Sequence, residues 1–186
     1  MTRIISGRAG SLALDVPDAG TRPTSDRVRE SLFGALESAD AVRGAAVLDL
    51  YAGSGALGLE ALSRGAASAD LVEKSPRAAT VAQRNATRVA TSIGTGAIAR
   101  VHRTAVDAYL RAAVGPFDLV FIDPPYDLGD AELTATLGLL VPRLAEHATV
   151  VIERSSRSPE PGMPDGLAVS RSKKYGDTAL WWVSPA

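Results

Sequence analysis

The hydrophobic positions of this chain follow two alternating periods along most of its length. Short apolar runs typical of buried strands are separated by longer stretches in which apolar residues recur at helical spacing. The strand-like runs are 46–51, 69–73, 97–103, 117–123 and 149–153. The helical stretches between them span about 56–64, 75–89, 106–113 and 130–145. This alternation predicts parallel strands joined by helical crossovers, and therefore a doubly wound α/β fold.

The C-terminal part of the chain departs from this alternation. Residues 167–173 and 178–183 have the pattern of two strands, and no helix fits between them. They are expected to form an antiparallel hairpin at the sheet edge, which completes a seven-stranded, mostly parallel sheet. Residues 154–166 contain three prolines and two glycines and are expected to form a surface loop.

The N-terminal part is expected to contain a helix and a small extension. The helix runs from about Ser25 to Ser38, with Thr24 or Ser25 as its cap. One face holds its apolar residues Val28, Leu32, Phe33 and Leu36, and the charged residues Arg27, Arg29 and Glu30 are expected mostly elsewhere. Residues 1–22 have short extended pieces between glycines. We therefore expect an N-terminal β-hairpin extension over 1–22 and one main domain over 23–186.

Composition narrows the possible functions. The chain has 186 residues, 46% of them hydrophobic, which is enough for one sizeable core. It has no cysteine and only two histidines, which excludes thiolate and multi-histidine metal sites, and no metal is expected. No apolar run has the length of a membrane span or a signal peptide, which predicts a cytoplasmic protein with no membrane partner. The net charge of −1, taken alone, argues against a nucleic-acid partner.

A glycine-rich loop is the first candidate for a binding site. Residues 49–58, DLYAGSGALG, place G-x-G-x-x-G between a predicted strand and a predicted helix. Its glycines allow a tight turn and a close approach of the backbone to a ligand at the helix N-terminus. Glu73 follows Gly55 by 18 residues, at the end of the next strand, where an acid binds ribose hydroxyls. By itself the pattern is also compatible with a simple strand-to-helix turn.

Asp49 indicates which ligand the loop would bind. A carboxylate at this strand end repels a pyrophosphate but attracts an ammonium or a sulfonium cation. S-adenosyl-L-methionine carries both cations and no phosphate, so Asp49 favours this cofactor over a dinucleotide. The same carboxylate can cap the loop by accepting hydrogen bonds from its amides, and the two roles are compatible.

The segment Asp123-Pro124-Pro125-Tyr126 follows the fourth central strand, at the edge where open α/β sheets bind ligands. Its prolines fix the backbone and remove two amide donors, which leaves the carboxylate and nearby carbonyls as acceptors. The tyrosine ring can stack on a base. Such a cluster suits a planar exocyclic amine, because the acceptors direct the nitrogen lone pair toward an incoming methyl group. The alternative is a strand stopped by two prolines, and the neighbouring glycine loop favours the amine site.

Three blocks of sequence together resemble the RsmD family of class I methyltransferases. They are TRPTSDRVRESLF at 21–33, DLYAGSGALGLEALSRG at 49–65 and DPPY at 123–126. The likeness runs from about Arg3 to Trp182, and the first two blocks are highly specific. That family methylates the exocyclic N2 of a guanine in 16S rRNA. The resemblance implies the same activity here, by direct in-line methyl transfer, with 16S rRNA in an assembled or assembling small ribosomal subunit as partner.

The resemblance also implies roles for individual residues. Amine recognition and catalysis are expected at Asp123, Pro124, Pro125 and Tyr126. Contacts to the cofactor are expected at Asp49, Tyr51, Ala52, Gly53, Gly55, Glu73 and Lys74. Where such enzymes often place an acid or amide near the adenine amine, this chain has Thr104 and Ala105, with Asp107 further on. Adenine is therefore expected to be read there mainly by the backbone.

Contacts to RNA would have to come from local basic patches. Residues 1–29 hold five arginines against three aspartates, and residues 154–174 hold five basic residues against two acidic ones. The preferred candidates are Arg8, Arg22, Arg27 and Lys174, and the N-terminal hairpin is expected to help hold RNA. Arg27 has an alternative as a surface ion pair with Asp26 or Glu30, which would contribute little energy.

Three other functions share part of this pattern. A DNA adenine-N6 methyltransferase would share the Asp-Pro-Pro-Tyr chemistry, but usually needs an added target-recognition domain for which this chain has little room. A nicotinamide oxidoreductase would share the glycine pattern but neither Asp49 nor the segment 123–126. A non-catalytic RNA-binding module would need neither acid.

Overall fold

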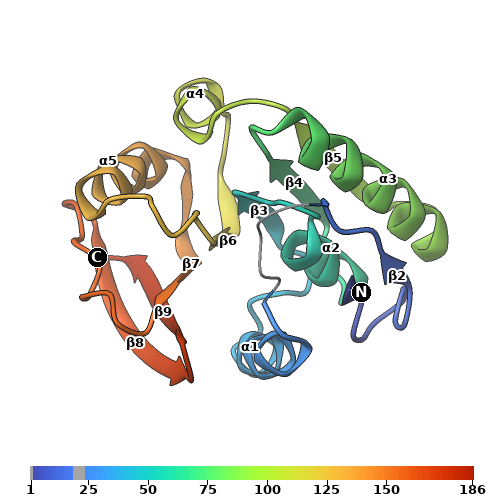
Figure 1. The fold of residues 1–186 in the computed structure, drawn as a ribbon, viewed down its shortest axis with the longest axis horizontal. Helices are drawn as coiled ribbons and strands as arrows, with labels where there is room; N and C mark the ends of the chain where they lie inside the picture. The colour runs from blue at the N-terminus through green and yellow to red at the C-terminus, as the bar shows by residue number, and fades with distance from the viewer. Residues whose placement is uncertain (1, 19–23) are drawn as a thin grey trace.

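The structure is a computed structural model and describes residues 2–18 and 24–186. Five parallel strands form its centre (Figure 1). The parallel strands are β3 (Ala46–Leu50), β4 (Ser68–Val72), β5 (Ile98–His102), β6 (Phe117–Ile122) and β7 (Leu144–Ser155). β9 (Thr178–Pro185) runs antiparallel to β7, and β8 (Leu167–Tyr175) runs antiparallel to β9. The order across the sheet is β5-β4-β3-β6-β7-β9-β8. The predicted seven-stranded sheet with a terminal antiparallel hairpin is confirmed.

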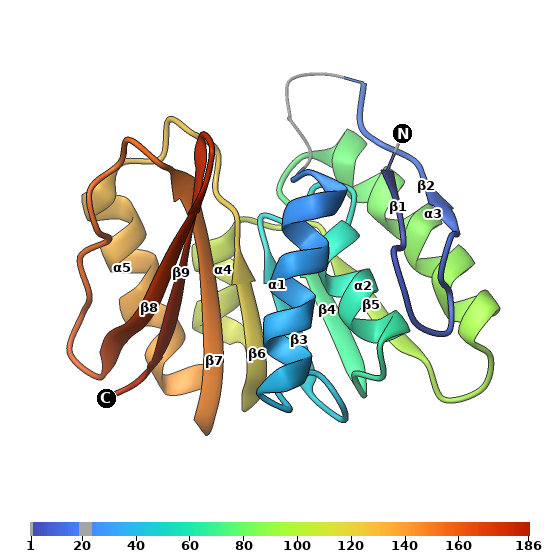
Figure 2. The ribbon, with the colours of Figure 1, turned by 90° about the horizontal axis from the view of Figure 1, so that it is seen from below.

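Helices cover both faces of this sheet (Figure 2). α1 (Asp26–Ser38), α2 (Ala56–Ser63) and α3 (Pro76–Ile93) pack on one face, in a core that includes Phe33, Leu71 and Phe121. α4 (Val106–Ala112) and α5 (Asp130–Leu140) pack on the other, with Leu50 and Val120. Successive residues of a strand point to opposite faces, so every second strand residue belongs to the core under α1–α3. No described helix has both the length and the apolar character needed to cross a membrane.

Several predicted boundaries are wrong. The helix predicted over 130–145 ends at Leu140, and Val141–Arg143 form a 3₁₀ turn, because Pro142 has no amide hydrogen to continue the α-helix. β7 starts at Leu144, five residues earlier than predicted, and extends two residues into the predicted loop. α3 continues past residue 89 to Ile93 and stops where Gly94 has φ 95°.

α1 decides between the two predicted caps and differs from its prediction in one residue, Arg29. Ser25 is the cap, because its hydroxyl accepts the Val28 amide, whereas Thr24 bonds elsewhere. Arg29 was expected mostly off the buried face but is 1% exposed. Its guanidinium donates to the Arg3 carbonyl and to Asp26, both at 2.8 Å. These partners come from outside the apolar stripe, so the helical period could not reveal that the arginine is buried.

The predicted N-terminal hairpin is present as two short strands, β1 (Thr2–Arg3) and β2 (Ala13–Leu14). A fully buried acid of α2, Glu60, fastens it to the main domain. Glu60 accepts the backbone amides of Ile5 and Ser6 at 2.8 and 3.0 Å. It also accepts Arg64 Nε at 2.8 Å and lies 3.6 Å from Arg29 Nη1. The hairpin therefore shares one core with α1 and α2. The proposed domain limit falls among residues 19–23, which lie outside the described residues.

Replacing Glu60 should test this attachment. Glu60→Ala leaves the amides of Ile5 and Ser6 without their acceptor and removes a buried negative charge beside Arg29 and Arg64, so we expect a loss of about 3–5 kcal/mol in the free energy of unfolding. Urea denaturation measures it. Glu37→Ala is the matched control, since Glu37 pairs with the same Arg64 from a half-exposed position and should cost less than about 1 kcal/mol. Equal costs would contradict the assigned role of Glu60.

Candidate active site

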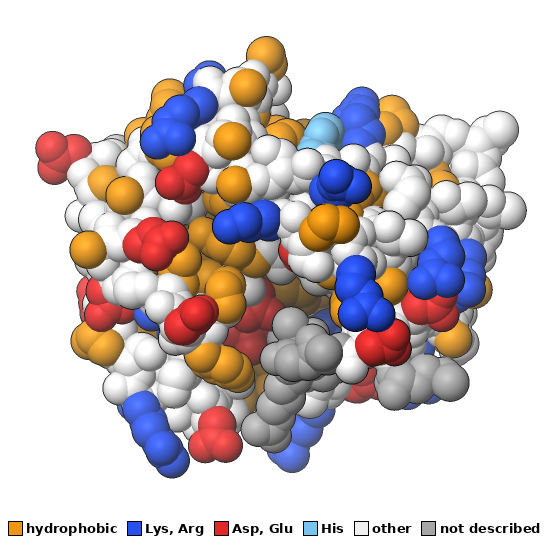
Figure 3. Space-filling view, turned by 45° about the horizontal axis from the view of Figure 1, so that its top comes forward, with side chains coloured by type: hydrophobic (Ala, Val, Ile, Leu, Met, Phe, Trp, Pro, Cys, Tyr) orange, Lys and Arg blue, Asp and Glu red, His pale blue; other side chains and the backbone are white. Residues whose placement is uncertain are grey.

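A cavity of about 920 Å³ opens at the carboxyl ends of β3, β4, β6 and β7. Figure 3 shows this region as a hollow with acidic side chains at its floor and hydrophobic ones beside it. Most of the predicted site residues line it: Asp49, Tyr51, Ala52, Gly53, Glu73, Lys74, Ala105, Asp123, Pro124, Pro125 and Tyr126. The structure thus brings together two motifs that are far apart in the sequence, at the edge where open α/β sheets bind their ligands.

Two of the predicted cofactor residues lie outside the lining. Gly55 starts α2 with φ 84°, and a Cβ there would lie 2.8 Å from Leu71 Cδ1, so this glycine is needed for packing. The backbone amide of Thr104 donates a hydrogen bond to the His102 carbonyl at 3.1 Å. By contrast, a Cβ on Gly53 would meet no atom within 4 Å, although φ is 56°. The open side of the glycine loop is therefore at Gly53.

Two carboxylates hold the glycine loop to the sheet. Asp49 Oδ2 accepts the Gly58 amide at 2.9 Å, which is the capping bond anticipated from the sequence. Glu73 accepts the Gly53 amide with one oxygen and the Ser75 amide with the other, at 2.9 and 2.8 Å. These bonds join the ends of β3 and β4 to Gly53 of the loop, to Gly58 in the first turns of α2 and to Ser75 before α3, so contacts within the chain hold the loop in place.

Asp49 is 2% exposed, and its burial raises the pKa of the carboxyl to about 7. The Gly58 amide opposes this pKa shift, and the nearby Glu73 charge adds to it. Asp49 Oδ1 accepts no hydrogen bond from the described residues. A buried acid with this free oxygen is stabilised as an anion by a cationic ligand.

Asp123 has a second acid as its neighbour. Ile122 of β6 pairs with Ile152 of β7, so Asp123 and Glu153 follow side by side. Burial raises the pKa of Asp123 well above its usual value, and the charges of Glu153 and Asp49 add to the rise. Burial also raises the pKa of Glu153, although Thr24 donates to it at 2.7 Å. The pair is thus poised to bind groups that donate hydrogen bonds.

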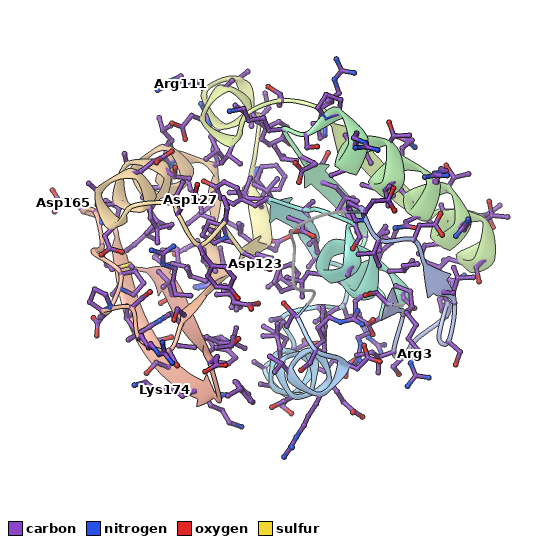
Figure 4. All side chains as sticks on the ribbon, in the orientation of Figure 1. Arg3, Arg111, Asp123, Asp127, Asp165 and Lys174 are labelled. Atoms are coloured by element: carbon purple, nitrogen blue, oxygen red, sulfur yellow. The ribbon has the colours of Figure 1, made fainter. Side chains whose placement is uncertain are left out.

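Glu153 is a site residue that the sequence reasoning missed. A signal was available in the sequence, since Glu153 ends the fifth predicted central strand just as Asp123 ends the fourth. Figure 4 shows Asp123 near the middle of the molecule, at the end of β6. Tyr126 lies beyond it and is 73% exposed, so its ring is free to stack on a base at the mouth of the cavity.

The predicted RNA contacts do not lie together. Arg22 falls outside the described residues. Arg8 donates to the carbonyl of Ile93 at the end of α3, at the opposite edge of the sheet from the glycine loop. Arg27 and Lys174 are exposed near a smaller cavity of about 240 Å³, bounded by the start of α1 and the β8–β9 turn. Within the described residues Arg27 has no ion pair with Asp26 or Glu30, so its alternative as a surface pair is not seen.

The fold and this site define a class I methyltransferase. The sheet order, the glycine loop with an acid beneath it and the Asp-Pro-Pro-Tyr segment occur together in one cavity. S-adenosylmethionine is its cofactor, and the residues fit it: Gly53 leaves room for a ligand, and Asp49 offers a free anionic oxygen to its cationic end. A pyrophosphate would face that same anion. In the described ranges, no group of three or more His, Asp or Glu side chains is arranged to hold a metal ion.

Comparison with known proteins identifies the family. The family model described as conserved hypothetical protein 95 matches residues 2–184. "Ribosomal RNA small subunit methyltransferase D" of Escherichia coli K12 is 40% identical over 178 residues, covering 95% of this chain and 86% of the relative. "Putative rRNA methyltransferase YlbH" of Bacillus subtilis is 34% identical and covers 96% of both chains. The solved "putative methyltransferase yhhF" of Escherichia coli superposes with a TM-score of 0.84 at 36% identity, covering 98% of this chain and 97% of that one. The chain belongs to the RsmD family of methyltransferases.

The pKa of Asp49 should make cofactor binding depend on pH. A cationic ligand binds the ionised carboxylate more strongly than the protonated one. The affinity for the cofactor should therefore rise about tenfold from pH 5.5 to 7, the range in which Asp49 ionises. The amino group of the cofactor stays charged in this range, because it loses its proton only at higher pH. Titration calorimetry measures this. Asp49→Asn should bind weakly and without this pH dependence. A flat profile for the unmodified protein would contradict the assignment.

The same pKa shift has a consequence for stability. Between about pH 4 and 7 the folded protein holds a proton on Asp49 that the unfolded chain has lost. The free energy of unfolding of the ligand-free protein should therefore fall as pH rises through this window. Asp49→Asn should lack the decrease in the free energy of unfolding that Asp49 causes. Urea denaturation of the unmodified protein and of Asp49→Asn, each at pH 5 and pH 8, measures the difference. An identical fall in the two proteins would refute it.

Glycine substitutions should separate binding from packing. Gly53→Ala places a methyl group in the open side of the loop, so it should weaken cofactor binding more than tenfold at a cost of about 1 kcal/mol for the positive φ. Gly58→Ala is the contrasting variant, because its Cβ would overlap Leu71 and should destabilise the fold itself. Calorimetry and thermal unfolding distinguish the two. Equal losses of stability would show that Gly53 is also a packing residue.

Proposed function

We propose that the protein transfers a methyl group from S-adenosylmethionine to the exocyclic N2 amine of a guanine in 16S rRNA. The observation that carries the proposal is that Asp123-Pro124-Pro125-Tyr126 lines the same cavity as the glycine loop. The relatives named as rRNA small subunit methyltransferases support RNA of the small subunit as the substrate. We propose that the substrate is an assembled or assembling subunit and that the protein acts in the cytoplasm.

The chain's own residues would prepare the amine. When bound, the cofactor supplies a methyl group on a sulfonium, which needs a nucleophile in line with it. Asp123 accepts a hydrogen bond from N2 and turns its lone pair out of conjugation with the ring. Pro124 and Pro125 present no amide hydrogen that could compete for that lone pair. Tyr126 stacks on the base. Positioning and electrostatics thus provide most of the rate enhancement.

The reaction also releases a proton, and Asp123 is placed to accept it. As the new N–C bond forms, N2 becomes acidic and must lose one hydrogen. The raised pKa of Asp123 brings this carboxylate closer to neutral pH, where a proton acceptor works best. Water in the open cavity is the alternative acceptor. No covalent enzyme intermediate is required.

We propose that RNA reaches this site across the rim formed by α1 and the β8–β9 hairpin. Arg27 and Lys174 provide positive charge there, and Tyr126 provides an aromatic surface. Arg22 and the N-terminal hairpin with Arg8 remain candidates for more distant contacts. Since the chain is not basic overall, binding of arbitrary RNA should be weak and sensitive to salt.

The direct test uses labelled S-adenosylmethionine with small ribosomal subunits that lack the modification, and with DNA in parallel. We expect label in 16S rRNA, and mass spectrometry of the digested RNA should identify N2-methylguanosine and its position. Label on DNA adenine would support the competing DNA methyltransferase. Binding of NAD without any methyl transfer would support an oxidoreductase.

Asp123→Ala should separate catalysis from cofactor binding. Without the acceptor for N2, transfer should fall at least about 100-fold, whereas affinity for S-adenosylmethionine should change little. The control is Asp165→Asn, which removes an exposed carboxylate outside both cavities and should keep most of the activity. Loss of cofactor binding in Asp123→Ala would refute its role at the amine.

A further inference from the structure

We propose that Glu153 makes the site specific for guanine, by accepting a hydrogen bond from N1–H of the base while Asp123 accepts one from N2. The inference deepens the proposed function and rests on it. It assigns to the chain a specificity residue at the end of β7 and a supporting residue, Thr24, before α1. Four observations carry it: the strand order, the Thr24 contact, the shape of the cavity and the hydrogen-bonding pattern of guanine.

The strand order places Glu153 on the substrate side of the site. The glycine loop follows β3, Asp123 follows β6 and Glu153 lies near the carboxyl end of β7, and these strands are consecutive in the sheet. Glu153 is thus separated from the cofactor loop by the strand that bears Asp123. Asp49 already provides the anion at the cofactor end. A second acid beyond Asp123 is therefore placed to meet the other molecule in the reaction.

Thr24 holds the carboxylate in position. Its hydroxyl donates to Glu153 Oε2 at 2.7 Å, and both residues line the main cavity. Glu153 Oε1 accepts no hydrogen bond from the described residues, although the residue is only partly exposed. One oxygen is therefore fixed by the protein, and the other is available to a ligand.

The two cavities meet at this carboxylate. Glu153, Thr24 and Tyr126 line both the main cavity and the smaller one beside the β8–β9 turn. A base that enters from the smaller cavity must pass Tyr126 and Glu153 before its amine reaches Asp123. The acid therefore lies on the path of the base, beside the Watson–Crick edge that carries the amine.

An acid at this point is explained by the pattern of donors on guanine. A carboxylate repels RNA phosphates, so it is unfavourable in an RNA site unless it accepts hydrogen bonds from a base. Guanine presents N1–H and the N2 amine as adjacent donors, which match two adjacent carboxylates. Adenine presents an acceptor at N1, whose lone pair would face Glu153. Burial raises the pKa of both acids, and the charge of Glu153 adds to the rise at Asp123, so a base that donates to both carboxylates would stabilise their charged forms.

The experiment changes a single position of the base. The target guanosine, once mapped, is replaced by 2-aminopurine ribonucleoside in ligated 16S rRNA that is then reconstituted into subunits. This base keeps the N2 amine but has an acceptor at N1. For the unmodified protein we expect kcat/KM to be about 10- to 100-fold higher for guanine, since a hydrogen bond to a charged group is lost. Equal rates on the two bases would overturn the proposal.

Glu153→Gln is the matched variant. Its carbonyl can still accept from Thr24, while its amide presents a donor to N1 of 2-aminopurine. The guanine preference should therefore shrink at least tenfold or reverse, with little change in affinity for S-adenosylmethionine. An equal fall in rate on both bases, with the preference unchanged, would show a structural role and refute the proposal.

Thr24→Val keeps the acid and removes only its support. Its guanine preference should fall between those of the unmodified protein and Glu153→Gln, and an unchanged preference would refute the positioning role of Thr24. If Glu153→Gln does not fold, as its cofactor affinity would reveal, Thr24→Val still decides, because its guanine preference falls only if the preference depends on the Glu153 carboxylate. Failure of the proposed function is distinct, because guanine would then not be methylated by any of these proteins.

Discussion

The site depends on one unfavourable constraint, which is the complete or partial removal of three carboxyl groups from water near the carboxyl ends of adjacent strands. Asp49 is the last but one residue of β3, Asp123 follows β6, and Glu153 lies two residues before the end of β7, and burial raises the pKa of each. Desolvation works against folding here, so stability must come from the two cores on either side of the sheet. The same arrangement suits ligand binding, because unpaired acceptors in a cavity attract cations and amine donors. The positive charges and hydrogen-bond donors that these carboxylates lack within the described chain would come from the ligands.

The acids also serve as parts of the scaffold. Asp49 and Glu73 use one or both oxygens on amides of the glycine loop and its surroundings, and Thr24 fixes one oxygen of Glu153. Each carboxylate is thereby oriented by bonds to the chain, and only its remaining acceptor capacity faces the cavity. Oriented acceptors need little rearrangement when a substrate arrives, which is the condition for electrostatic catalysis.

The sequence predicts most of the fold because the strands and crossovers have strong periods, and the motifs at strand ends then meet by topology. The sequence did not predict several local features. Pro142 ended α5 early, and the burial of Arg29 depends on the Arg3 carbonyl and on Glu60, which no helical period contains. Glu153 was missed because its motif is a single acid, whose meaning appears only when the strand order places it beside Asp123. The roles of the individual site residues remain predictions, since they depend on ligands rather than on the chain.

The attachment of the hairpin through Glu60 bears on the order in which these parts of the chain can fold. The amides of Ile5 and Ser6 bond to an acid 55 and 54 positions later in the sequence. Closing a loop of this length has an entropic cost that the local contacts of the hairpin do not offset by themselves. The hairpin therefore depends for its place on a helix that is synthesised after it.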